Sequence, residues 1–162
     1  MKPAPFSIHI PDTLDEALTC LTEHGEEARV IAGGQSLMAM LNMRLAEPDH
    51  LIDISRIAEL KTLKLDKDGI TVGAGITQTE VFDHPDLMQY MPLLHSALHH
   101  VGHIQTRNRG TICGSLCHAD PSAEMPLLLA TLGGTVTLRS SSGTRTLSAS
   151  EFQRGPLTVE KH

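Results

Sequence analysis

Tryptophan is absent from this chain of 162 residues, and aromatic residues make up only 2% of it. The sequence therefore lacks the stacking platforms by which proteins bind single-stranded nucleic acids. Basic residues are also few, 13 against 19 acidic ones, which gives a net charge of −6. A negative net charge excludes a general polyanion-binding protein, and we expect no nucleic-acid partner. A bound phosphate would be held by backbone N–H groups and a few local arginines.

Cysteine is scarce as well, and its three positions (Cys20, Cys113 and Cys117) do not form a disulfide framework. Reduced thiols are typical of a cytoplasmic protein, which is the location we expect. The sequence contains no apolar run of membrane-spanning length and opens with no signal segment, so we expect neither a transmembrane helix nor a secretory signal peptide. A chain of this length fits one domain, with room for two lobes.

The first part of the chain, residues 1 to about 55, has the pattern of a β-α-β-α-β unit with a small parallel sheet. A strand in PFSIHI precedes a helix that Asp12-Thr13 can cap and Gly25 can end. The apolar run Ala28–Ala32 predicts a buried parallel strand. A helix follows up to Pro48, and HLIDIS predicts the third strand.

The second part, about residues 56–162, has the pattern of an α+β lobe with an antiparallel sheet. Two hairpins are predicted, and between them residues 77–103 show helical stretches punctuated by prolines. The first hairpin joins Leu60–Leu65 to Gly69–Gly73, and the second joins Gly133–Leu138 to Gly143–Leu147. The fold class is therefore α+β with two lobes.

The segment AGGQSL at Ala32–Leu37 follows the predicted strand and opens a helix. Glycines permit a close backbone approach, and N–H groups at a helix start attract anions. Ser36 can cap the helix, and Gln35 can donate to an oxygen. An ordinary strand–helix turn explains the same residues equally well. Neither the G-x-G-x-x-G nor the P-loop pattern is present.

A second polar segment runs from Arg107 to Glu124, and within it TICGSL at Thr111–Leu116 is predicted to form a second glycine-bearing loop. Such a density of Gly, Arg, Asn, Thr and Ser between packed elements is typical of a site. Asp120-Pro121-x-x-Glu124 predicts a helix start with proline at the first helical position. Capping and ligand contact are equally open for Asp120. For the two arginines in the segment, structural or inter-subunit pairing is favoured over direct phosphate contact.

Together, VIAGGQSLMAMLNMRLAEPDHLIDIS and VGHIQTRNRGTICGSLCHADPSAEMPLLLATLGGTVTLRSSSGTRTLSASEF resemble the FAD-binding medium subunit of molybdenum hydroxylases, the group of aerobic carbon monoxide dehydrogenase and xanthine dehydrogenase. The resemblance covers nearly the whole chain. It implies a vanillyl-alcohol-oxidase type (PCMH-type) FAD fold, with FAD as cofactor between the lobes. It also implies an oxidoreductase subunit that transfers electrons and has no catalytic acid or base of its own. The implied partners are an iron–sulfur small subunit and a molybdenum cofactor large subunit.

In that family, the loop matching Ala32–Ser36 wraps the pyrophosphate and a T-x-G-G-S motif, here Thr111–Ser115, acts from the opposite lobe. Further matching positions lie beside the flavin or near the ribityl and ribose hydroxyls. The resemblance thus implies the cofactor contacts Ala32, Gly33, Gly34, Gln35, Ser36, Leu37, Val101, Gly102, Thr111, Gly114, Ser115, Asp120 and Glu124.

Two departures from the family pattern stand out. Cys113 replaces the first glycine of T-x-G-G, where a side chain could reshape the loop. Family members also carry a further C-terminal α+β domain, and the sequence stops at GPLTVEKH, so we expect that domain to be absent. These departures motivate an alternative: a scaffold or assembly module of the same fold with weak or no FAD binding.

A weaker alternative is a metal site built from Cys113, Cys117 and His118. The C-x-x-x-C-H spacing matches no standard zinc motif, and no second cysteine pair exists. We therefore expect no metal site, and we interpret Cys117 as a small buried hydrophobic residue.

Overall fold

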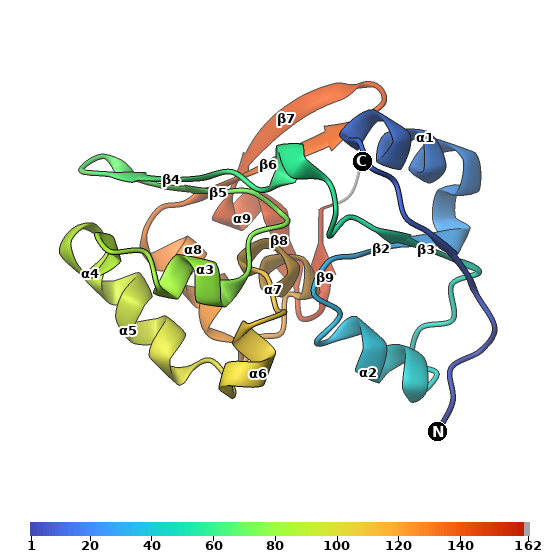
Figure 1. The fold of residues 1–162 in the computed structure, drawn as a ribbon, viewed down its shortest axis with the longest axis horizontal. Helices are drawn as coiled ribbons and strands as arrows, with labels where there is room; N and C mark the ends of the chain where they lie inside the picture. The colour runs from blue at the N-terminus through green and yellow to red at the C-terminus, as the bar shows by residue number, and fades with distance from the viewer. Residues whose placement is uncertain (161–162) are drawn as a thin grey trace.

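The computed structural model describes residues 1–160. Its first third is a three-stranded parallel sheet with helices α1 and α2 on either side of it (Figure 1). The strand order is β1-β3-β2. Both outer strands run parallel to β3, with Ser7 and Ala28 each opposite His50. This confirms the predicted β-α-β-α-β unit. Its elements are β1 (Ser7–His9), α1 (Leu14–His24), the 3-10 turn η1 (Gly25–Glu27), β2 (Ala28–Ile31), α2 (Leu37–Asn42) and β3 (His50–Asp53).

Local interactions define both ends of helix α1. The Thr13 hydroxyl accepts from the Glu16 N–H, and the Glu16 carboxylate accepts from the Thr13 N–H, which closes a capping box. Gly25 ends the helix at φ 51°, a conformation that glycine adopts without strain. Ala17 is buried in one hydrophobic cluster with Ile52 of β3, which fixes the helix on the sheet.

Two local predictions in this region are wrong. β2 is an edge strand rather than a buried one, because β3 takes the central place, and Val30 is 43% exposed. α2 ends at Asn42 instead of continuing to Pro48. The chain turns out of the helix at Arg44, whose φ is 56°, and the Leu45 N–H then donates back to the Met40 carbonyl.

The rest of the chain combines short helices with antiparallel hairpins. Both predicted hairpins are present, and each forms a two-stranded sheet of its own. A third, short strand pair closes the described chain. The elements are η2 (Ala58–Leu60), β4 (Leu63–Asp66), β5 (Gly69–Val72), α3 (Gln78–Phe82), α4 (Leu87–Tyr90), α5 (Pro92–His100), α6 (Ile104–Arg107), α7 (Ile112–His118), α8 (Glu124–Thr131), β6 (Thr135–Ser140), β7 (Gly143–Ser148), α9 (Ala149–Phe152), β8 (Gln153–Gly155) and β9 (Thr158–Val159).

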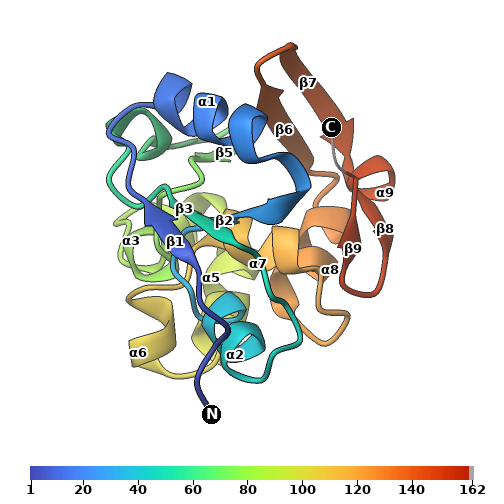
Figure 2. The same cartoon turned by 90° about the vertical axis from the view of Figure 1, so that its right-hand side faces the viewer.

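Most of the buried apolar residues form two separate hydrophobic clusters. One lies between α1 and the parallel sheet and includes Ala17, Ile52 and Ile57. The other joins α3, α5, α7, α8 and α9 and includes Leu98 and Phe152. In Figure 2, α1 and α2 lie on opposite faces of the parallel sheet. Among residues 1–160, no helix has the length and apolar character needed to cross a membrane.

Candidate cofactor site

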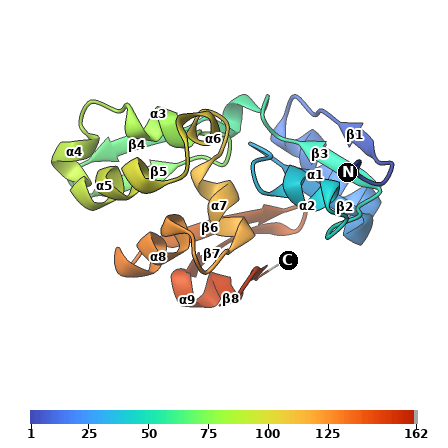
Figure 3. The ribbon, with the colours of Figure 1, turned by 90° about the horizontal axis from the view of Figure 1, so that it is seen from below.

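The loop after β2 and the segment before α7 touch through their backbones. A Cβ placed on Gly33 would lie 2.6 Å from the carbonyl carbon of Arg109 and 2.8 Å from the Cα of Gly110. Ordinary carbon contacts are about 3.5–4.0 Å, so only glycine fits this position. The structure therefore brings the two predicted glycine-bearing segments together. Figure 3 shows the start of α7 beside the chain that leads into α2.

The first of these segments presents a run of unused backbone donors. The N–H groups of Gly33, Gly34, Gln35 and Ser36 donate no hydrogen bond to any residue from 1 to 160. Gly34 has φ +70°, which lets the chain turn sharply from β2 into α2. Consecutive free N–H groups at the carboxyl end of a parallel strand form an anion-binding arrangement.

The side chains of Gln35 and Ser36 differ in whether they hydrogen-bond to the loop backbone. The Gln35 side-chain amide donates to the Gly33 carbonyl at 3.2 Å, so one of its two N–H donors is engaged within the loop. Ser36 does not cap α2, and that prediction is wrong. Its backbone is already helical at φ −96° and ψ −47°, whereas a capping residue needs an extended backbone.

The second segment is a helix start rather than a loop, which corrects the prediction for Thr111–Leu116. Thr111 is the N-cap of α7, and its hydroxyl accepts from the Gly114 N–H at 2.9 Å. A Cβ on Gly114 would lie 2.7 Å from the Thr111 Oγ1, so glycine lets this cap close. Ser115 lies in the helix, with its N–H bonded to the Thr111 carbonyl. The Cys113 N–H has no acceptor among the residues described.

A hollow of about 160 Å³ opens where the two segments meet. It brings together three of the predicted contact residues, Ala32, Gly33 and Thr111, with two cations, Lys61 and Arg109. Its volume suits part of a dinucleotide, because whole small-molecule sites measure about 300–1,000 Å³. The remaining lining residues are Ser55, Gly75, Thr77 and Asn108.

A larger hollow of about 600 Å³ lies between α1 and the β6–β7 turn. Its lining holds two carboxylates, Asp15 and Glu23, against one cation, Arg139, which is paired with Asp15, so its net charge is negative and disfavours phosphate groups. It contains none of the predicted contact residues. Position and charge therefore make the smaller hollow the candidate site.

The other predicted contacts lie outside the lining of the smaller hollow: Gly34, Gln35, Ser36, Leu37, Val101, Gly102, Gly114, Ser115, Asp120 and Glu124.

The two arginines of the second segment have different surroundings. The Arg107 guanidinium donates to the Val101 carbonyl at 2.9 Å and to the Gly102 carbonyl at 3.3 Å. It also lies 5.8 Å from the centroid of the Phe82 ring. Arg107 is thus structural, as expected. Arg109 forms no ion pair with any described residue.

The helix predicted from Pro121 begins at Glu124 instead. The Asp120 carboxylate accepts from the Ser122 hydroxyl at 2.7 Å and the Ser122 N–H at 2.8 Å, and these bonds lower the pKa of Asp120. This local turn, together with the left-handed backbone of Ala119 at φ 51°, prevents the helix from starting at Pro121. The Glu124 carboxylate accepts no hydrogen bond from residues 1–160 and remains open to a ligand.

Sequence reasoning missed the part of the site that α3 contributes. The Thr77 hydroxyl and N–H donate to the Glu80 carboxylate at 2.7 Å and lower its pKa, and Lys61 acts in the same direction. The T-x-x-E spacing of this capping box was readable in the sequence. Gln78 donates from its N–H to the Gly110 carbonyl at 2.8 Å. Its buried side-chain oxygen has no partner within the described chain, and no local signal indicated that.

Cys113, which departs from the family pattern, is directed away from the hollow. Its sulfur lies 3.6 Å from the Val72 carbonyl of β5. Burial, and secondarily Cys117, raises the pKa of the Cys113 thiol to about 12. A thiol that stays protonated at neutral pH is a poor metal ligand and nucleophile, so Cys113 does not support the Cys–His metal alternative. Cys117 is exposed, so its interpretation as a small buried hydrophobic residue is wrong.

Over residues 4–162, the sequence matches the family described as the FAD binding domain in molybdopterin dehydrogenase. The chain belongs to this family. The glyceraldehyde dehydrogenase medium chain of Sulfolobus acidocaldarius is 38% identical to it over 160 residues, 99% of this chain and 57% of that protein. The carbon monoxide dehydrogenase medium chain of Hydrogenophaga pseudoflava is 35% identical over 155 residues, 96% of this chain and 54% of that protein.

Solved structures agree with this assignment. Quinoline 2-oxidoreductase from Pseudomonas putida 86 superposes with a TM-score of 0.94 at 40% identity. The carbon monoxide dehydrogenase of Hydrogenophaga pseudoflava also gives 0.94, at 34% identity. Both matches cover 100% of this chain and 56% of the other. The fold is thus that of the family's α+β FAD-binding domain, the family's cofactor is FAD, and the chain spans about half the length of these relatives.

Proposed function

We propose that this chain is the FAD-binding part of the medium subunit of a molybdenum hydroxylase. In this role it transfers electrons from iron–sulfur clusters of a small subunit to an external acceptor, while a large subunit holds the molybdenum cofactor. Family membership and medium-chain relatives support the proposal. The three free cysteines fit a reducing cytoplasm.

The observation that carries the proposal is the close approach of Gly33 to the Arg109–Gly110 backbone, next to unused N–H donors. We propose that the N–H groups of Gly33–Ser36 and of Cys113 donate to the pyrophosphate. Arg109, which has no ion-pair partner among the described residues, adds positive charge at the same hollow. When bound, FAD supplies the redox chemistry.

The remaining predicted contacts complete the proposed site. Glu124 is the better candidate for a ribose or ribityl hydroxyl, since its carboxylate is open whereas that of Asp120 already accepts two bonds. Val101 and Gly102 are proposed to face the flavin, with their carbonyls held by Arg107. The two hydrophobic clusters support a division into lobes near residue 55, with the cofactor bound between the lobes.

An FAD titration of the purified protein tests the proposal. Saturable binding should quench flavin fluorescence and raise the Tm, because a ligand that binds only the folded state stabilises it by mass action. If FAD at high micromolar concentration neither saturates the protein nor moves its Tm, the FAD site is wrong and the scaffold alternative is supported.

A matched pair of variants locates the site. Gly34→Asp and Gly34→Asn place side chains of equal size at the same backbone position, whose φ of +70° both residues tolerate better than most. Only Asp adds a negative charge. A charge about 5 Å from one phosphate costs about 3 kcal/mol at an effective dielectric constant of 20, which is more than a hundredfold in affinity. Equal FAD affinity of the two variants would show that the pyrophosphate lies elsewhere.

A further inference from the structure

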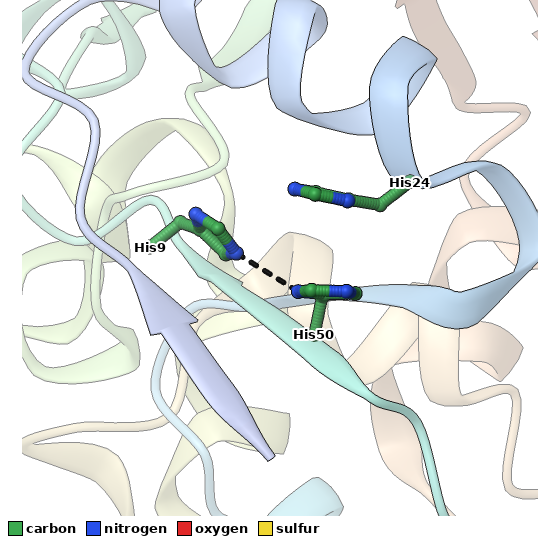
Figure 4. A group of neighbouring side chains, drawn as sticks. All are labelled: His9, His24 and His50. Atoms are coloured by element: carbon green, nitrogen blue, oxygen red, sulfur yellow. Dashed lines mark hydrogen bonds between the residues drawn. The ribbon is translucent and has the colours of Figure 1, made fainter.

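Three histidines from distant parts of the sequence meet at one corner of the parallel sheet (Figure 4). His9 belongs to β1, His24 to the end of α1 and His50 to the start of β3. One ring nitrogen from each lies within 4.8 Å of the others. All three residues are partly buried, so the group is neither sealed in the core nor spread over the surface.

The fold brings the three together for simple reasons. His50 and Ile52 lie two residues apart on β3 and therefore share one face of the sheet. His9 is the register partner of Ile52, so it lies on that face as well. Ile52 is fully buried in the cluster that includes Ala17, which shows that this is the face covered by α1. His24, the last residue of α1, comes down onto the same face.

The distances already approach those of a metal site. His9 Nε2 and His50 Nδ1 are 3.0 Å apart, and one donates a hydrogen bond to the other. Two imidazole nitrogens on a tetrahedral ion, each about 2.05 Å from it, are separated by about 3.3 Å. Replacing this hydrogen bond by two metal bonds lengthens the N–N distance by only about 0.3 Å. The donor ring must also carry its proton on its other nitrogen, and both rings must turn so that their lone pairs point at the ion.

The His24 ring needs a larger adjustment. It stacks on the His50 ring with centroids 3.8 Å apart and planes 12° from parallel. Parallel rings cannot direct their lone pairs at one ion, so the His24 ring must turn about its side-chain bonds. No hydrogen bond to the described part of the chain holds that ring, and it lies at a helix end beside Gly25.

We propose that His9, His24 and His50 bind one divalent transition ion of the zinc class, with water in the fourth position. Three neutral imidazoles without a carboxylate suit Zn²⁺, Co²⁺, Ni²⁺ or Cu²⁺ and do not suit Mg²⁺ or Ca²⁺. Such an ion would tie β1, α1 and β3 together. The site is separate from the candidate FAD site, because the three histidines lie on the face of the sheet that α1 covers, whereas the glycine loop leads from β2 into α2 on the opposite face.

A zinc titration by calorimetry, after chelator treatment and dialysis, tests this proposal. We expect one saturable site and a Tm rise of about 5 °C or more once free Zn²⁺ exceeds the dissociation constant by about a hundredfold. Protons compete for imidazole nitrogens, so affinity should fall at least about tenfold between pH 7.5 and 5.5. Co²⁺ should give visible absorption bands of a tetrahedral ion.

The chain has ten histidines, and those outside the proposed site could bind zinc non-specifically, so the test needs a matched control. His9→Ala/His24→Ala and His99→Ala/His100→Ala each remove two neighbouring imidazoles, and the second pair lies on exposed positions of α5. Only the first variant should lose the site, with at least about a tenfold drop in affinity.

Circular dichroism would show whether each variant folds, and His24→Gln, at the helix end, serves if the double variant does not. Equal zinc binding by His24→Gln and the parent overturns the proposal. Absence of saturable binding to the parent at millimolar Zn²⁺ does so as well.

Discussion

Replacing Gly33 by Ala should separate the two segments that form the candidate FAD site. The new Cβ would lie 2.6 Å from the Arg109 carbonyl carbon and 2.8 Å from the Gly110 Cα, against about 3.5–4.0 Å for an ordinary contact. The backbones must therefore move apart by about 1 Å. Overpacking of this kind costs about 1–3 kcal/mol, which lowers the Tm of a protein of this size by about 3–10 °C.

The same displacement should weaken FAD binding at least tenfold, since it moves the N–H donors of the loop away from those of α7. Thermal melts and FAD titrations of Gly33→Ala measure both effects. Gly155→Ala is the control, because its Cβ meets nothing within 4 Å and its φ is unremarkable. If Gly33→Ala has the Tm and FAD affinity of Gly155→Ala, the inferred contact between the segments is wrong.

Three further predictions concern stability and the roles of individual side chains. The pKa of Glu80 is lowered by the hydroxyl and N–H of Thr77, so its stabilising effect exists above the ordinary value of 4.5 and disappears as the pH falls through the lowered pKa. Urea unfolding should therefore show Glu80→Gln to be about 0.3–1 kcal/mol less stable at pH 7, because Gln keeps the capping box but loses the negative charge at the helix start, and equal to the parent in strong acid. Cys113→Gly should lose about 1–2 kcal/mol in thermal unfolding and leave FAD affinity unchanged, because the sulfur contacts β5 and not the hollow; a large gain in affinity would contradict this orientation. Arg107→Ala should lower the Tm by leaving two carbonyls without their donor, whereas Arg109→Ala should preserve the Tm and reduce FAD affinity, most strongly at low salt. The reverse pattern in melts and titrations would exchange their proposed roles.

Short-range signals account for the elements that the sequence predicted correctly. The Thr13–Glu16 capping box and Gly25 delimit α1, because both act within one helical turn. The hairpins follow from turn residues between apolar strands, and Gly69 and Gly143 have φ of 142° and 144°. Parallel pairing was predictable too, since each helix must return the chain to the same edge of the sheet.

Errors occurred where a local pattern allowed two outcomes. The apolar residues of Ala28–Ala32 suit a buried strand, yet strand order left β2 at an edge. The glycine in Thr111–Leu116 indicated a loop, whereas it relieves crowding at a helix cap. Asp120 and Pro121 suit a helix start, but the side chain of Asp120 formed a turn with Ser122 first.

The sequence by itself determined the family, the α+β class and the two glycine-bearing segments, because periodicity, caps and motifs are properties of neighbouring residues. Only the tertiary structure decided that Gly33 meets the Arg109–Gly110 backbone and that the His50 ring lies under His24. Both contacts join residues far apart in the chain. Their geometry depends on strand order and helix position, which packing of the whole domain sets and no short pattern encodes.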